Sequence, residues 1–163
     1  MYNFVPNGII IISSFVRTFI TSIEVAYIIA PKPIDKIVEI LQEYLTSLSN
    51  RDYMNFSEKY IKLMFYCIVK NITTYRVKSE MEVERKYPDL LVMPKEREKG
   101  YASIMIEFKY LKKGEENKLE EKQKEAREQI LGYAELEEIR NIERLNMYTI
   151  VAVNDRLYVE KVN

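Results

Sequence analysis

Apolar residues recur at helical spacing in two segments of the first half of the chain. Along residues 34–48 they fall on one helical face, and they do so again along residues 58–71, where Ser57 stands at the N-cap position. These apolar positions are Ile37, Ile40, Leu41, Tyr44, Leu45 and Leu48 in the first segment, and Ile61, Phe65, Ile68 and Val69 in the second. The pattern predicts two amphipathic helices, each with one face against a core.

From residue 73 onward, apolar and polar positions alternate, which is the period of a half-buried strand. We expect strands over residues 73–84, 87–93 and 101–110, with a charged hairpin loop at 94–100. The third segment is an almost unbroken apolar run, which is typical of a central, fully buried strand.

The last part of the chain returns to helical spacing and then to strands. The charged stretch 112–124, read as a solvated helical face, leads into a helix, and strands are expected over 147–153 and 156–162. The inner face of this helix comprises Ala126, Ile130, Tyr133, Ala134 and Leu136. The order of elements predicts a single α/β domain over residues 1–163, with a mixed β-sheet flanked by helices.

The apolar stretch 9–30 is about as long as a membrane span. Arg17 and Glu24 lie near its middle, and two charges there oppose insertion into a bilayer. We therefore expect residues 1–33 to pack on the domain, with a membrane-associated protein as the alternative. No basic stretch precedes the apolar run, which argues against a signal peptide. The sequence favours a cytoplasmic protein.

Composition narrows the chemistry more than the charge does. Hydrophobic residues make up 47% of the chain, and 25 basic residues balance 25 acidic ones, so net charge indicates no partner. The lone Cys67 lies in an apolar run and is expected to be buried and inert. The absence of histidine excludes Ser-His-Asp systems and the usual zinc hydrolase sites. Acid–base or metal chemistry would depend on oxygen ligands, which favour Mg²⁺ or Mn²⁺.

Two acidic residues fall on neighbouring expected strands. Asp89 follows Pro88 at the start of one strand, and Glu107 lies near the end of the next, with Lys109 two residues later. Period two places Glu107 and Lys109 on one face, and hairpin pairing would bring Asp89 near Glu107. Two close carboxylates repel each other unless a cation lies between them, so the trio suggests a divalent metal site.

These residues resemble the signature of the PD-(D/E)XK nuclease superfamily, with Pro88-Asp89 followed by Glu107-Phe108-Lys109. On the next expected helix, Gln129 and Tyr133 resemble the Q-x-x-x-Y motif of RecB-type members. Residues four apart share a helix face, so both side chains are expected to point towards the site or the substrate phosphate.

The resemblance narrows to the nuclease-like domain at the C-terminus of AAA-ATPase-like proteins. Ser79-Glu80 and the Val5-Pro6-Asn7 start are similar to that family, and Glu58 matches its helical glutamate more loosely. The Gly/Arg-rich stretch before the family's aspartate is represented here only by Arg85. No G-x-x-x-x-G-K-[ST] sequence is present, so ATP hydrolysis by that route is excluded.

The resemblance implies a restriction-endonuclease-like fold and Mg²⁺- or Mn²⁺-dependent hydrolysis of DNA. Asp89 and Glu107 would bind the metal, and Lys109 would position or activate the attacking water and stabilise charge. The remaining candidates are Gln129 and Tyr133 for orientation, Glu58 and Glu80 as further metal ligands, and Arg85, Lys112 and Lys113 for the substrate. A homodimer and a separate ATPase partner are also implied. The rival hypothesis is a catalytically silent interaction module that keeps the same fold. As a separate alternative, Asp89 would be a turn residue, Glu107 and Lys109 a surface pair on an edge strand, and Tyr133 a core residue.

Overall fold

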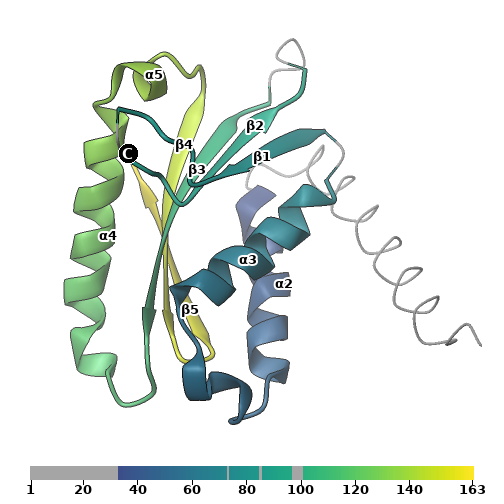
Figure 1. Ribbon diagram of the computed structural model, residues 1–163, viewed down its shortest axis with the longest axis vertical. Helices are drawn as coiled ribbons and strands as arrows, with labels where there is room; N and C mark the ends of the chain where they lie inside the picture. Colours follow the sequence, from purple (N-terminus) through teal and green to yellow (C-terminus); the bar gives the residue numbers. More distant parts are fainter. Residues whose placement is uncertain (1–32, 73, 85, 97–100) are drawn as a thin grey trace, which may run out of the picture.

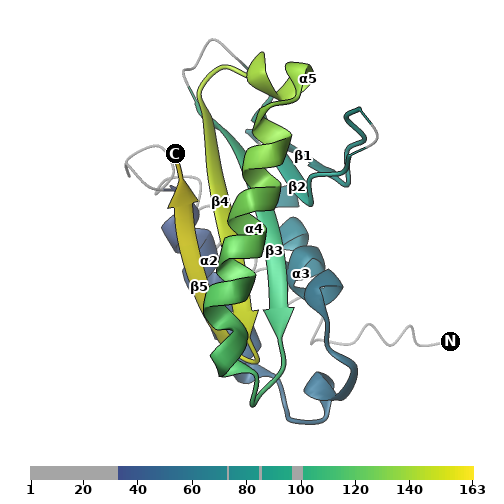
Figure 2. The same ribbon diagram turned by 90° about the vertical axis from the view of Figure 1, so that its left-hand side faces the viewer.

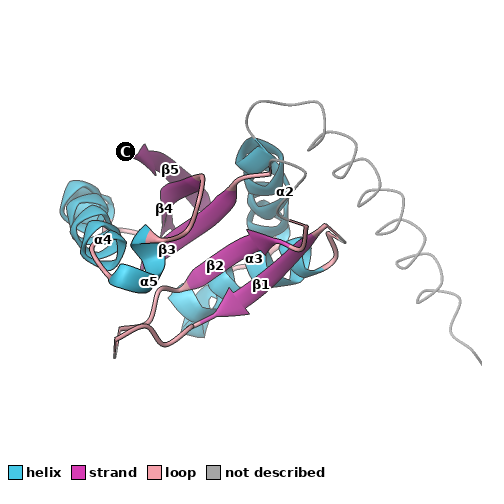
Figure 3. Cartoon of the chain, turned by 90° about the horizontal axis from the view of Figure 1, so that it is seen from above, coloured by secondary structure: helices cyan, strands magenta, loops and turns pink. Residues whose placement is uncertain are grey.

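The computed structural model describes residues 33–72, 74–84, 86–96 and 101–163, and these form three layers. A five-stranded sheet lies in the middle, with helices α2 and α3 on one face and helix α4 on the other (Figure 1). The view from above in Figure 3 shows α4 separated from α2 by the sheet. The expected α/β mixed sheet flanked by helices is confirmed.

The sheet has the strand order β1-β2-β3-β4-β5, which follows the chain. Its strands are β1 (Tyr75–Ser79), β2 (Leu90–Pro94), β3 (Ser103–Leu111), β4 (Leu145–Val153) and β5 (Arg156–Val162). β3 and β4 pair in parallel and every other neighbouring pair is antiparallel. A parallel pair needs a crossover connection, and α4 (Leu119–Ala134) with the short α5 (Glu137–Arg140) provides it. Figure 2 shows α4 lying along β3 and β4.

Helices α2 (Pro33–Ser47) and α3 (Glu58–Lys70) follow their apolar periodicity closely. A single-turn helix, η1 (Asp52–Asn55), connects them, and η3 (Glu116–Lys118) precedes α4. The four expected inner positions of α3 are all buried. Tyr44 was expected to be buried, but it is 45% exposed because it lies at the margin of the α2 stripe.

At α3, the position expected for the N-cap is confirmed without its hydrogen bond, and the expectation that Cys67 is buried is wrong. Ser57 adopts the extended N-cap backbone, but its side chain makes no capping hydrogen bond. Cys67 is exposed. The buried positions of α3 are Ile61, Phe65, Ile68 and Val69, and Cys67 falls outside that stripe although its sequence neighbours are apolar.

The strands before the site are shorter than their alternation predicts. β1 ends at Ser79, and Glu80 has a φ of 49°, which a strand does not tolerate. Glu82 therefore lies outside the strand, in a segment held by the isolated bridge between Val83 and Lys86. β2 begins at Leu90, so Asp89 lies one residue before it.

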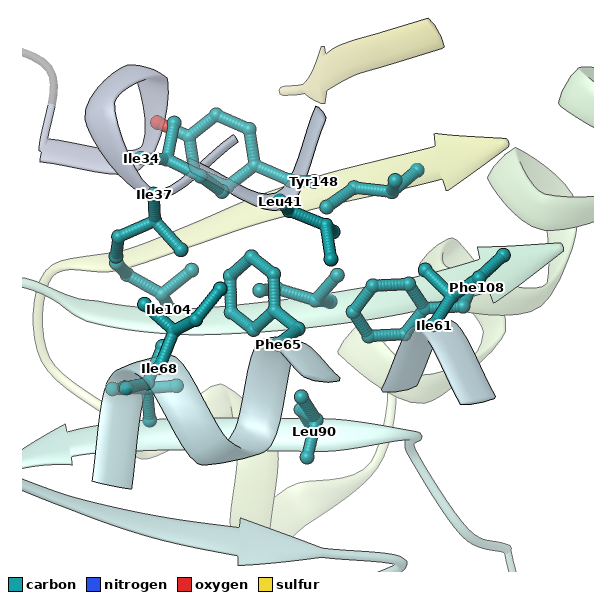
Figure 4. Packing of buried hydrophobic residues seen from close by; sticks show 14 of the residues in the cluster. Ile34, Ile37, Leu41, Ile61, Phe65, Ile68, Leu90, Ile104, Phe108 and Tyr148 are labelled. Carbon is teal, nitrogen blue, oxygen red and sulfur yellow. The ribbon is translucent and has the colours of Figure 1, made fainter. Parts of the chain in front are cut away.

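The main core lies between the sheet and the helices α2 and α3. Phe65 of α3 meets Phe108 of β3 edge-on, with ring centroids 5.5 Å apart. Figure 4 shows Ile61 and Leu90 packed around this pair. A second cluster, containing Met105, Ile130 and Tyr133, fills the space under α4. Successive residues of β3 thus face different cores, as period two requires.

Some expectations concern residues outside the described ranges. These are the packing of the N-terminal segment before Pro33, the start at Val5-Pro6-Asn7, and Arg85. Among the described residues, none of the helices has the length and apolar character needed to cross a membrane.

Phe65→Ala should lower the free energy of unfolding by about 3–5 kcal/mol, because it leaves a cavity against Phe108. Urea denaturation would measure this change. Leu63→Ala, on the exposed side of the same helix (54% exposed), should change it by no more than about 0.5 kcal/mol. Equal losses in the two variants would contradict the packing described for α3.

Candidate functional site

The fork between β2 and β3 brings the candidate acidic residues together. β2 pairs with β3 from Val92 to Leu90, where Leu90 lies opposite Ile106. The same register places Asp89 next to Glu107. β3 continues to Leu111 and pairs there with β4, so in the described chain its other edge is open beyond Ile106. The expected hairpin and the proximity of Asp89 to Glu107 are both present.

The carboxylate of Asp89 closes the fork. Its Oδ2 accepts a hydrogen bond of 2.9 Å from the backbone N–H of Phe108, at the edge that β2 has left. Its Oδ1 lies 3.2 Å from Nζ of Lys62 on α3. Asp89 is 8% exposed, so both interactions are formed largely away from water. Each oxygen of this carboxylate therefore has a partner.

Glu107 and Lys109 share one face of β3, as period two predicts, while Phe108 packs into the α2/α3 core. Nζ of Lys109 donates to Oε1 of Glu107 at 2.7 Å. The two residues are 1% and 7% exposed. The other oxygen of Glu107, Oε2, is buried and has no hydrogen-bond partner among the described residues.

A second buried oxygen lies beside Glu107. Thr149 of β4 is the parallel neighbour of Glu107 in the register, and its Oγ1 also has no partner in the described part of the chain. Buried polar atoms are normally satisfied, so such neighbours mark a place where a water, an ion or a ligand belongs. Thr149 was not predicted from the sequence, because only the register identifies it as a neighbour of Glu107.

Burial and charge raise the pKa of Glu107 to about 7. Loss of solvation is the largest cause, and the charge of Asp89 adds to it, while Lys109 opposes the shift. The pKa of Lys109 is also raised: burial lowers it, but the carboxylates of Glu107, Glu58 and Asp89 outweigh that effect. For Lys109, the effect of the neighbouring negative charges is therefore larger than the effect of burial.

Helix α3 contributes two side chains to the open edge. Glu58, in its first turn, is half-buried, and burial raises its pKa, with Asp89 adding to the rise and Lys109 opposing it. Lys62, one turn later, contacts both Asp89 and Glu80. Lys62 was not predicted from the sequence, although its spacing of four residues from Glu58 on the same helix face was an available signal.

Helix α4 contributes Gln129 and Tyr133 from the opposite layer. Nε2 of Gln129 donates to the hydroxyl of Tyr133 at 2.6 Å. Tyr133 is buried in the cluster under α4, and burial raises its pKa, with further contributions from the charges of Glu107 and Asp89. Tyr133 is thus a core residue whose hydroxyl is close enough to Glu107 and Asp89 for their charges to raise its pKa. Gln129 is exposed.

The remaining candidates are peripheral. Lys112 and Lys113 are exposed in the turn that follows β3, and Glu80 is exposed and bound to Lys62. Within the described ranges, no three acidic or cysteine side chains are grouped so that they could hold a metal ion. Metal binding would therefore have to start from the pair Asp89 and Glu107.

This pair fits a divalent cation on its own chemistry. Its members are hard oxygen donors, the charge of Asp89 raises the pKa of Glu107, and Oε2 of Glu107 has no hydrogen-bond partner among the described residues. Lys109 pairs with Glu107 and Lys62 pairs with Asp89, so a cation bound here would share these carboxylates with two ammonium groups.

The raised pKa of Glu107 makes stability pH-dependent in a defined direction. The folded protein holds this proton up to a pH of about 7, whereas the unfolded chain releases it near 4.5. Stability should therefore fall as pH rises between these values, by on the order of 3 kcal/mol for this group. Urea unfolding in metal-free buffer should show wild type losing stability relative to Glu107→Gln from pH 5 to 7.5. A constant difference across this range would contradict the assignment, and Glu120→Gln on exposed α4 controls for loss of a carboxylate.

The candidate site lies within a segment that matches a known family. The family model described as PD-(D/E)XK nuclease superfamily matches residues 56–161, a range that includes α3, α4 and all of the sheet except the last residue of β5. No curated protein and no solved structure gives a significant match to the chain. The family match covers more than half of the 163 residues and spans the fork, the Glu107–Lys109 pair and Tyr133. The chain belongs to the PD-(D/E)XK nuclease superfamily.

Proposed function

We propose that this protein hydrolyses phosphodiester bonds of DNA with Mg²⁺ or Mn²⁺. The observation that carries the proposal concerns Oε2 of Glu107, which lies in the same site as Asp89 and Lys109. This oxygen is buried and has no hydrogen-bond partner among the described residues. A carboxylate oxygen that is unused and lies next to a second carboxylate can serve as a ligand for a divalent cation.

Asp89 and Glu107 would hold the cation. When bound, a divalent cation supplies a Lewis acid for the phosphoryl oxygen and lowers the pKa of water. The bond from Phe108 N–H to Asp89 and the burial of Glu107 fix the two carboxylates before any ligand arrives. Such fixed geometry lowers the reorganisation that the reaction needs.

Lys109 would act at the reacting phosphate. Its ammonium group is held 2.7 Å from Glu107, and its raised pKa keeps it protonated. A protonated lysine in this place orients the attacking water and stabilises negative charge that develops on the phosphate. It does not serve as a general base in this charge state.

Residues around the pair would orient the substrate. Gln129 and Tyr133 hydrogen-bond to each other beside the acidic pair, and Glu58 adds a half-buried carboxylate from α3. Lys112 and Lys113 lie just beyond the end of β3, where they could contact the DNA backbone. A homodimer and a separate ATPase partner stay predictions, because no described contact bears on them.

Asp89→Asn, Glu107→Gln and Lys109→Met should each reduce cleavage at least about 100-fold, since each removes a charge that acts on the reaction. The assay uses single- and double-stranded DNA and RNA with Mg²⁺ or Mn²⁺, and EDTA should abolish cleavage. Lys124→Ala, at an exposed surface pair on α4, serves as the matched control. Equal cleavage by wild type and all three variants would assign the activity to a contaminant. No cleavage by pure, folded wild type would favour the silent interaction module.

Replacing both Lys112 and Lys113 by alanine should weaken DNA binding and flatten its salt dependence. For each phosphate that a lysine no longer neutralises, the slope of log K against log [salt] should fall by about 0.9 on duplex DNA. Fluorescence anisotropy over a salt series, with catalytically blocked Glu107→Gln as the background, measures this slope. An unchanged slope would place the DNA path elsewhere.

A further inference from the structure

Lys62 connects the carboxylates of Asp89 and Glu80, two residues that are also joined by a backbone hydrogen bond from Glu80 N–H to the carbonyl oxygen of Asp89. It extends from α3, its side chain is only 13% exposed, and its Nζ contacts both Asp89 and Glu80. Glu80, by contrast, has a side chain that is 63% exposed and stands at the end of β1 with a φ of 49°. One contact of Lys62 is therefore sheltered and the other lies at the surface.

The atoms that Lys62 uses matter for the acidic pair. Oδ2 of Asp89 is engaged by the backbone of Phe108, which leaves Oδ1 as the oxygen available to a ligand. Lys62 occupies this oxygen at 3.2 Å. Lys109 similarly occupies Oε1 of Glu107 and leaves Oε2 free. Lys62 therefore contacts Oδ1 of Asp89, the oxygen through which this residue would bind a cation.

We propose that Lys62 is a positioning residue that competes with the divalent cation for Oδ1 of Asp89 and withdraws to Glu80 when the cation binds. This inference rests on the proposed metal site. In the metal-free protein, the ammonium group supplies positive charge that Asp89 requires in its buried setting. Without it, two carboxylates would face each other with only Lys109 to compensate them.

Glu80 gives Lys62 a second place to go. Its Oε1 already accepts a hydrogen bond from Nζ, so the lysine can release Asp89 without losing every charged partner. An exposed carboxylate has little desolvation to overcome when its partner changes. Glu80 would thus favour metal binding indirectly, through Lys62, rather than as a ligand.

The test is calorimetric titration of Mn²⁺ into the DNA-free protein. Lys62→Met should bind Mn²⁺ about tenfold more tightly than wild type, because a positive charge next to a ligand oxygen is removed. Glu80→Gln should bind it more weakly, because Lys62 then loses its alternative partner. Lys70→Met, which removes a lysine in the last turn of the same helix, should bind as wild type does.

The double variant Lys62→Met/Glu80→Gln separates an indirect role of Glu80 from a direct one. If Glu80 acts only through Lys62, the double variant should bind Mn²⁺ as Lys62→Met does. Thermal unfolding adds a second readout. In EDTA, Lys62→Met should melt below wild type, since Asp89 loses its positively charged partner, and saturating Mn²⁺ should narrow the difference.

Two results would overturn the inference alone. One is that wild type binds Mn²⁺ and Lys62→Met binds it equally well or more weakly. The other is that the double variant Lys62→Met/Glu80→Gln binds Mn²⁺ more weakly than Lys62→Met does. Glu80→Gln alters only a surface carboxylate, so it tests the competition even if Lys62→Met does not fold. If neither wild type nor Lys62→Met binds Mn²⁺, the proposed metal site itself fails.

Discussion

The hydrogen bond from the backbone N–H of Phe108 to Asp89 is the interaction on which the arrangement of this site depends. β3 loses its β2 neighbour after Ile106, and an unpaired N–H at that edge would be costly when buried. The carboxylate takes the place of the missing strand. The sheet can therefore split at this point, which opens β3 to side chains from α3 while Glu107 and Lys109 stay buried beneath α4.

The splitting of the strands explains how charged residues can be buried here. Asp89, Glu107, Lys62 and Lys109 form two adjacent ion pairs, one from helix to strand end and one within β3. Each pair satisfies part of the charge that burial would otherwise penalise. The arrangement is incomplete at Oε2 of Glu107 and at its neighbour Thr149, among the residues that the structure describes. A water, an ion or a ligand at this place would complete the arrangement.

The layers of the fold and the proximity of Asp89, Glu107 and Lys109 could be predicted from the sequence, because both follow from short-range periodicity. Period two put Glu107 and Lys109 on one face, and the hairpin register put Asp89 beside them. Periodicity does not show where the pairing between two strands ends. β1 ends at Ser79 because the backbone turns at Glu80. Apolar and polar residues still alternate after this point, although they form no strand there. Lys62 and Thr149 join the site only through tertiary contacts and register, and Cys67 was misjudged because apolar neighbours do not define the buried stripe of a helix.

The double duty of Asp89 bears on how such a site would decay over evolutionary time. One of its oxygens serves the backbone of β3, so replacing it by a side chain without an acceptor would damage the sheet as well as the chemistry. Lys109 makes its described hydrogen bond with Glu107. A lineage released from selection for catalysis could therefore lose Glu107 and Lys109 together and retain an aspartate or asparagine at the fork. An acidic residue conserved there would by itself be a poor indicator of an active enzyme.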